Sequence, residues 1–308
     1  MPAPFPVDPH LTGISIAYKN ADYIADAVLP RVYVGKESFK YWLYNLGEGF
    51  TIPNTRVGRK SEPNQVEFSA TEATASTDDY ALDDLIPQSD IDNAPANHDP
   101  KARAVQGITD LVMLDREVRT AGLVFAAANY NAANKATLAG NDQWSDFVNS
   151  DPVEDIETAL NACLARPNIA VFGQETWSVL RRHPTIIKAV NRSSGDKGLA
   201  SRQDVAELFE LEEILVGQGR LNTAKKGQAV TLSRVWGKHA AFLYRNRLAD
   251  TQQGLTFGFT AQFGDRVAGE IAAPTKGMRG GTIVRAGESV KELIVADRAG
   301  YLFTNAVA

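Results

Sequence analysis

The chain has 308 residues, of which 44% are hydrophobic and 22% are charged, as is usual for a soluble folded protein. This length allows two domains, or one domain with large excursions. No apolar run approaches the roughly 18 residues of a membrane span. The formal net charge of −5 argues against a nucleic-acid-binding protein, which usually carries a basic patch, but it leaves open a protein that encloses nucleic acid.

The N-terminal region and the cysteine content indicate the setting of the protein. Residues 1–9 contain four prolines but neither the basic start nor the apolar core of a signal peptide, which predicts an extended arm that does not begin a helix. The single cysteine, Cys163, excludes a disulfide within the chain and a cysteine-rich zinc site. We therefore expect a reducing cytoplasm, or an assembly put together in one.

A short helix and a long hairpin are predicted next. Apolar residues at spacings of three and four predict a helix over residues 14–29, which Pro30 ends. A strand is predicted over residues 31–45 and a returning strand over residues 64–71, with a turn-rich tip between them. The hairpin carries aromatic side chains on both faces, and an isolated hairpin is barely stable in water. We expect it to lie either on the chain's own core or on another copy of the protein.

The segment that follows the hairpin is acidic. Residues 78–99 hold seven aspartates and two prolines. Closely spaced aspartates can chelate calcium, but this run lacks the glycine and the distant glutamate of a helix-loop-helix calcium site. A solvated loop is therefore the expected structure.

The longest predicted helix covers residues 101–130 and would be a rod of roughly 45 Å. A rod of that length is typical of a strut that lies under a sheet. Its predicted apolar stripe consists of Leu111, Leu114, Val118, Ala121, Phe125 and Ala128. Four charged residues are expected to face away from this stripe: Asp115, Arg116, Glu117 and Arg119.

The rest of the chain mixes helices and strands, so the predicted class is α+β. A hairpin or an irregular link over residues 134–152 precedes a helix that begins at Pro152, with Asp151 as its cap. Further predicted elements are a helix over 201–211, a strand over 213–217, polar loops over 191–198 and 218–228, and strands over 230–236, 240–246, 255–263, 281–287 and 289–297.

Residues 166–190 raise the question of a ligand site. An apolar run reaches Gly173 and a helical pattern follows, which is the order of elements in a phosphate-binding loop. A phosphate cradle needs several glycines, however, and Glu175 would repel phosphate. The pattern therefore favours packed scaffold over a ligand site.

Signatures of catalysis are weak. The chain holds no nucleotide-binding, zinc-protease or serine-hydrolase motif. Cys163 could act as a nucleophile with His183 or His239 as its base, but its neighbours Leu160 and Leu164 favour a cysteine that fills the core. We therefore predict no catalytic, cofactor-binding or metal-binding residue. The histidines are too scattered for a metal site: His10, His98, His183 and His239.

The order of these parts resembles the major capsid (coat) proteins of tailed bacteriophages, which have the Hong Kong 97-like fold. The resemblance covers essentially the whole chain, and it rests on the order of several stretches more than on any single motif. These stretches are "ISIAYKNADYIADAVLPRVYVGKESFKYW" (14–42), "DLVMLDREVRTAGLVF" (110–125), "RPNIAVFGQETWSVLRRHPTIIKAV" (166–190) and "VWGKHAAFLYRN" (235–246).

The resemblance implies a division of the chain into four regions. In that fold an extended E-loop lies over the neighbouring subunit, and loops of an axial domain meet around the symmetry axes. The implied regions are an N-terminal arm with a short helix (1–30), the E-loop excursion with an acidic link (31–90), a peripheral (P) domain with the spine helix (91–151, completed by about 246–308), and an axial (A) domain (152–245).

The resemblance also implies where subunits touch. We expect contacts at the arm, the excursion and the acidic link, and we hypothesise that the basic tip of the excursion meets the acidic segment of a neighbour. The residues proposed for these contacts are Phe5, Lys36, Phe39, Trp42, Tyr44, Phe50, Arg56, Arg59, Lys60, Asp78, Asp79, Asp83 and Asp84.

The implied function is that of a structural subunit, with no enzymatic activity. Its expected partners are many copies of itself in hexamers and pentamers, a separate scaffold protein, a portal and a decoration (cement) protein. The shell would enclose double-stranded DNA without sequence-specific binding and without a membrane, after assembly in the cytoplasm of the host bacterium, and would be locked non-covalently. The alternatives are an encapsulin-like nanocompartment shell and, from another class, a cytosolic cysteine hydrolase or ligand-binding domain.

Overall fold

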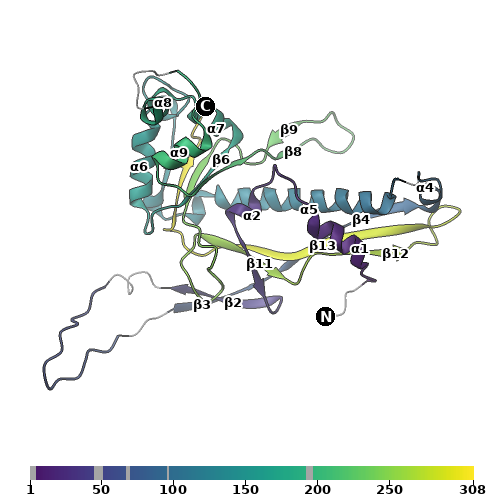
Figure 1. Ribbon diagram of the computed structural model, residues 1–308, viewed down its shortest axis with the longest axis horizontal. Coiled ribbons are helices and arrows are strands. Elements are labelled where there is room, and N and C mark those ends of the chain that lie inside the picture. The colour runs from purple at the N-terminus through teal and green to yellow at the C-terminus, as the bar shows by residue number, and fades with distance from the viewer. Residues whose placement is uncertain (1–4, 45–50, 67–69, 96, 192–196) are drawn as a thin grey trace.

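The computed structural model shows an elongated body, a compact body at one end of it, and a long loop that extends away from both (Figure 1). The elongated body is a sheet that lies along the longest helix, and the compact body is a second sheet surrounded by shorter helices. Among the described residues, no helix is long and apolar enough to cross a membrane. The described residues are 5–44, 51–66, 70–95, 97–191 and 197–308.

The sheet of the elongated body has five strands, and its long strand β13 pairs with β4, β11 and β12. Strand β1 adds in parallel to β11. The single strand β13 replaces the two strands that the sequence predicted over 281–287 and 289–297, and β12 was not predicted. The bounds are β1 Arg31–Val34, β4 Asp78–Pro87, β11 Gly258–Phe263, β12 Val267–Ala272 and β13 Gly281–Ile294.

The long helix α5 spans Pro100–Val124, which makes it shorter than predicted. It begins there because Asp99 accepts hydrogen bonds from the backbone N–H groups of Lys101 and Ala102, and a proline fits the first helical position. Its 25 residues give a rod of about 37 Å. A short 3-10 helix, Ala127–Asn129, occupies the remainder of the predicted segment.

The buried face of α5 is not the predicted one. Leu111 is 54% exposed, whereas Arg116 and Glu117 are 2% and 0% exposed. The buried positions lie on a neighbouring face of the same helix, and charged side chains can occupy it because they are hydrogen-bonded there. The prediction that Arg116 and Glu117 face solvent is therefore wrong.

The acidic segment is also corrected. Residues 78–87 form strand β4, which pairs antiparallel with β13 from Asp78 opposite Val290 to Pro87 opposite Gly281. A short helix α4, Gln88–Asp92, follows it. The aspartates remain compatible with a strand because they are exposed, and charged side chains protect a sheet from unwanted pairing.

The N-terminal region contains two helices where one was predicted: α1, Pro9–Ala17, and α2, Ala25–Val28. Asp8 caps α1 by accepting hydrogen bonds from two backbone N–H groups, and Pro9 takes the first helical position. The expectation that this proline-rich arm begins no helix is therefore wrong, because proline is well tolerated at that one position.

The compact body is built on a five-stranded sheet in the order β5-β14-β10-β6-β7. Its core contains large side chains such as Trp144, Phe172 and Phe242. Strands β5 and β14 lie outside the predicted 152–245 domain in the sequence, but both belong to this sheet. Strand β14 pairs with β10, and β5 pairs with β14. The bounds are β5 Lys135–Thr137, β6 Ile169–Gly173, β7 Glu213–Gly217, β10 Ala240–Leu243, β14 Gly300–Thr304, α6 Pro152–Ala162, α7 Gln174–Leu180, α8 Pro184–Asn191 and α9 Arg202–Leu208.

The strand, glycine and helix at 169–180 belong to this core. A Cβ on Gly173 would lie 1.9 Å from the carbonyl oxygen of Gly237, so glycine is needed here because two backbones approach closely. Every residue of the strand that precedes the helix is buried. The structure thus accounts for this glycine by packing.

Two hairpins leave the bodies. Strand β2, Ser38–Tyr44, pairs with β3, Ala70–Ser76, and the long loop connects them. The predicted strand 31–45 is thus two strands, β1 and β2, and the returning strand begins later than predicted. A second hairpin joins β8, Arg220–Asn222, to β9, Leu232–Arg234. Strand β8 lies in the region predicted as a polar loop (218–228), whereas β9 lies within the strand predicted over 230–236.

Candidate subunit interfaces

The β2–β3 hairpin is anchored on its own subunit. Phe39 is 8% exposed and packs with Phe259 and Ala261 of strand β11. Its ring centroid lies 6.4 Å from that of Tyr41, two residues further along the same face. Phe39 therefore stabilises the base of the hairpin on its own subunit, and its contact with another subunit stays a prediction.

Other predicted contact residues of the hairpin lie on its surface. Lys36 is exposed, and Trp42 is 37% exposed. Trp42 lines a cavity of about 690 Å³ between the hairpin and the end of the elongated body. The side chain of Tyr44 and the whole of Phe50 lie outside the described residues.

The described part of the loop beyond the hairpin is exposed throughout. Every residue of 51–66 is exposed, and Ile52 is 90% exposed. The loop extends far from both bodies (Figure 1). The three predicted basic contacts, Arg56, Arg59 and Lys60, are all on it. Because this segment buries so little surface on its own subunit, it is suited to bury surface on another protein.

The described part of the arm lies on its own subunit. The guanidinium carbon of Arg285 lies 5.5 Å from the ring centroid of Phe5. A Cβ on Gly269 would lie 2.1 Å from the carbonyl oxygen of Pro6, so glycine allows the arm to lie close to the sheet. Phe5 therefore makes a contact within the chain, and its contact with a neighbour stays a prediction. Residues 1–4 lie outside the described residues.

The four predicted acidic contacts differ in their partners. Asp78 pairs with Lys291 at 2.8 Å, and Asp83 accepts two hydrogen bonds from Arg285 at 2.6 and 2.7 Å. The hydrogen bonds from Arg285 lower the pKa of Asp83. Asp79 and Asp84 are exposed, and neither forms an ion pair within the described ranges. The last two are thus the carboxylates that remain accessible to a partner.

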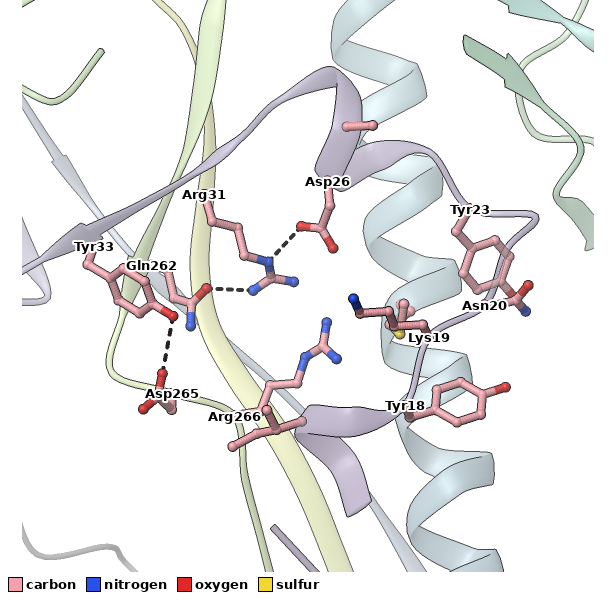
Figure 2. A pocket seen from close by; sticks show the side chains of 13 residues that line it. Tyr18, Lys19, Asn20, Tyr23, Asp26, Arg31, Tyr33, Gln262, Asp265 and Arg266 are labelled. Atoms are coloured by element: carbon pink, nitrogen blue, oxygen red, sulfur yellow. Dashed lines mark hydrogen bonds and ion pairs between the residues drawn. The ribbon is translucent and has the colours of Figure 1, made fainter. Parts of the chain in front are cut away.

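A buried ionic network that the sequence did not predict joins the N-terminal region to the elongated body. Figure 2 shows Arg31 and Arg266 around a cavity of about 390 Å³, with Asp26 at its edge. Arg31 donates to Asp26 at 2.6 Å and to Glu288 at 2.8 Å, and Arg266 donates to the same Glu288 oxygen at 2.9 Å. Arg116 of α5 also pairs with Asp26. Burial opposes ionisation of Glu288, but the guanidinium groups hold its pKa below the ordinary value.

Glu117 forms a second buried connection. Its carboxylate accepts hydrogen bonds from the backbone N–H groups of Ile24 and Ala25, at 2.9 and 2.8 Å, and from the indole N–H of Trp236 at 2.5 Å. Burial raises its pKa, while these hydrogen bonds oppose the rise. Helix α5 is thereby attached to α2 and to the segment before β10. A sequence pattern could not reveal this, because charges on a helix usually mark a solvated face.

The candidate catalytic residues are held in structural roles. Cys163 is half-buried, and burial raises the pKa of its thiol to about 11, so the reactive thiolate is scarce at neutral pH. His183 is fully buried, with its ring nitrogens 3.2 Å from Ser150 Oγ and 2.7 Å from Thr185 Oγ1. Within the described residues, no three His, Cys, Asp or Glu side chains form a group that could hold a metal ion.

This arrangement has the architecture of a shell-forming coat protein: a long helix under a sheet, a compact α/β body and an exposed excursion. Solved structures agree. The chain matches a phage-related protein from Bordetella bronchiseptica RB50 with a TM-score of 0.75 and 24% identity, covering 97% of both chains. It matches the capsid of cyanophage P-SCSP1u with a TM-score of 0.59 and 12% identity, covering 94% of this chain and 89% of that one. The Hong Kong 97-like capsid fold predicted from sequence is confirmed.

Sequence relatives identify the family. The model of the family "Phage major capsid protein E" matches residues 102–244. The major capsid protein of Pseudomonas phage JBD67 is 57% identical over 306 residues, which are 99% of each chain. The chain therefore belongs to the phage major capsid proteins, and its function is that of a structural subunit of the phage shell. The alternatives of an encapsulin-like compartment and of a cytosolic hydrolase or ligand-binding domain are set aside by this identity.

Proposed function

We propose that many copies of this chain assemble as hexamers and pentamers into an icosahedral shell around double-stranded DNA, and that the exposed loop 51–66 locks neighbouring subunits together. The observation that carries the proposal is that every residue of this loop is exposed and that the loop extends away from both bodies of its own subunit (Figure 1). Each loop contact is small, but many contacts per shell add up through multivalency. No catalytic step is part of this function.

The docking partner of the loop tip is the acidic strand β4 of a neighbour. Arg56, Arg59 and Lys60 supply the positive charge. Asp79 and Asp84 supply the accessible negative charge, since Asp78 and Asp83 are engaged within their own chain. Opposite charges on two exposed segments steer the encounter and select one register. Lys36 and Trp42 are exposed on the β2–β3 hairpin, and we propose that they extend the contact between the loop and the neighbouring subunit.

We keep the four regions that the sequence implied, with one change to the A-domain. The arm region (1–30), the excursion (31–90) and the P- and A-domains (91–151 with 246–308, and 152–245) remain the proposed units, with β5 and β14 assigned to the A-domain sheet. We propose a separate scaffold protein, a portal and a decoration protein as further partners. Assembly in the cytoplasm of the host bacterium and residence in the virion shell follow from the same proposal.

The test reverses the charge of the loop tip. The variant Arg56→Glu, Arg59→Glu, Lys60→Glu should remain a folded subunit but form few shells, because its tip would repel β4 of the neighbour. The matched control, Arg56→Lys, Arg59→Lys, Lys60→Arg, keeps the charge and should assemble like the unaltered chain. Particle yield is measured by sedimentation and negative-stain microscopy. Normal shells from the reversed variant would refute the role of the loop tip.

A further inference from the structure

The β8–β9 hairpin, residues 218–234, is a basic projection from the compact body (Figure 1). It carries Arg220, Lys225, Lys226 and Arg234, and it contains no aspartate or glutamate. In the part of the chain that the structure describes, none of these four cations forms an ion pair. This concentration of positive charge stands out in a chain whose net charge is −5.

The pairing within the hairpin points to an anionic partner outside it. Arg220 lies directly opposite Arg234 in the antiparallel register. Like charges at directly opposite positions destabilise a strand pair. Arg234 donates to the backbone carbonyl of Gln218 at 3.0 Å, which satisfies one donor but leaves the charge uncompensated. An anionic surface that covers this face would remove the repulsion.

The hairpin also has a defined shape before any partner binds. The side-chain oxygen of Asn222 accepts hydrogen bonds from the backbone N–H groups of Ala224 and Thr231, both at 3.1 Å. The N–H of Thr223 donates to the carbonyl of Thr231 at 2.9 Å. A preformed projection loses little conformational entropy on docking.

Its apolar residues favour a protein partner over nucleic acid. Val230 is 70% exposed and Leu232 is 55% exposed, next to the cations. The hairpin has no aromatic side chain on which a base could stack. Exposed aliphatic side chains gain free energy when another protein buries them, and phosphate groups cannot bury them.

A surface with the opposite properties lies at the start of α6, which runs along the other side of the compact body (Figure 1). We call it the acidic flank. Its carboxylates Asp142, Asp151 and Glu154 are exposed, and none forms an ion pair within the described residues. Its apolar residues are Phe147, 38% exposed, and Val148, 88% exposed. Cations and aliphatic residues on one side of the body therefore match carboxylates and apolar residues on the other.

We propose that, in each ring of subunits, the β8–β9 hairpin of one copy docks on the acidic flank of the next copy. Complementary patches on two different sides of one subunit form a head-to-tail interface, and such an interface builds a ring when the rotation between successive copies closes. The contact would thus help to define the pentamers and hexamers. This inference rests on the proposed assembly, and it names a contact distinct from that of loop 51–66.

A charge-swap experiment tests the contact in the full chain expressed with its neighbouring head genes. The hairpin variant is Lys225→Glu with Lys226→Glu, and the flank variant is Asp142→Lys with Glu154→Lys. Each should lower the yield of closed particles by about tenfold or more, and the combined swap should restore most of it. The control, Lys225→Arg with Lys226→Arg, should assemble normally. Thermal unfolding of the unassembled subunits checks that each variant is folded.

Two outcomes contradict the proposal: normal yields from both reversed variants, or no recovery in the combined swap. A hairpin variant that forms normal shells but fails to retain double-stranded DNA would assign the hairpin to nucleic acid instead, and would also overturn it. As a direct readout, carbodiimide treatment of unaltered particles should link Lys225 or Lys226 to Asp142 or Glu154 of another copy. If no such cross-link between copies forms, this result counts against the contact. If the unaltered chain forms no closed particle at all, the proposed assembly itself fails.

Discussion

The hydrogen bonds of Glu117 provide a quantitative test of how the subunit is held together. The carboxylate accepts from the N–H groups of Ile24, Ala25 and Trp236, all three of which belong to buried residues. In Glu117→Gln, the amide nitrogen replaces one oxygen and faces a donor, so at least one buried N–H loses its acceptor. Such a loss costs about 1–3 kcal/mol, and Glu117→Ala, which orphans all three donors, should cost at least about 3 kcal/mol.

Urea unfolding of dissociated subunits, followed by tryptophan fluorescence, measures these free energies. The matched control is Asp115→Asn on the exposed side of the same helix, where the carboxylate is 56% exposed and, among the described residues, pairs with Arg119 alone. An exposed pair of this kind contributes at most about 1 kcal/mol. If Glu117→Gln unfolds at the same urea concentration as the unaltered chain, the carboxylate does not hold these segments together.

Three further predictions concern single residues. Gly173→Ala should prevent folding or strongly lower the melting temperature, because the added Cβ would lie 1.9 Å from the carbonyl oxygen of Gly237, whereas Gly122→Ala, inside helix α5 with nothing within 4 Å, should slightly raise it because alanine favours the helix. Cys163 should react slowly with a disulfide reagent at neutral pH and faster as the pH approaches its pKa of about 11, whereas equal rates in folded and urea-unfolded protein would contradict its burial. Because the folded-state pKa of Glu288 lies below its ordinary value of 4.5, it contributes stability above that pH, and this contribution is lost as the pH falls through the folded-state pKa. Glu288→Gln should therefore flatten the acid limb of the unfolding profile, and an unchanged limb would contradict the network.

Features that depend on a few neighbouring residues could be predicted from the sequence. The start of α6 follows from Asp151 and Pro152, a cap and a first helical residue that fix a helix end without tertiary contacts. The scaffold role of residues 166–190 followed from too few glycines and from Glu175. The order of such elements along the chain was also enough to indicate the family.

Features that depend on tertiary contacts could not be predicted in this way. Periodicity placed the stripe of α5 on the wrong face, because it cannot reveal that Arg116 and Glu117 find buried partners far away in the sequence. The seven aspartates suggested a loop. The strand β4 was missed because its partner, β13, lies about 200 residues further along the chain. The packing of Phe39 on strand β11 could not be predicted either, since alternation in a hairpin does not say which sheet covers its apolar face.

The most direct test of the central claim is a cryo-electron microscopy reconstruction of particles formed by this chain with its neighbouring head genes. The predicted result is a closed icosahedral shell in which loop 51–66 of each subunit lies on strand β4 of a neighbour. Subunits that remain small and monodisperse, or a shell in which this loop folds back on its own subunit, would contradict it.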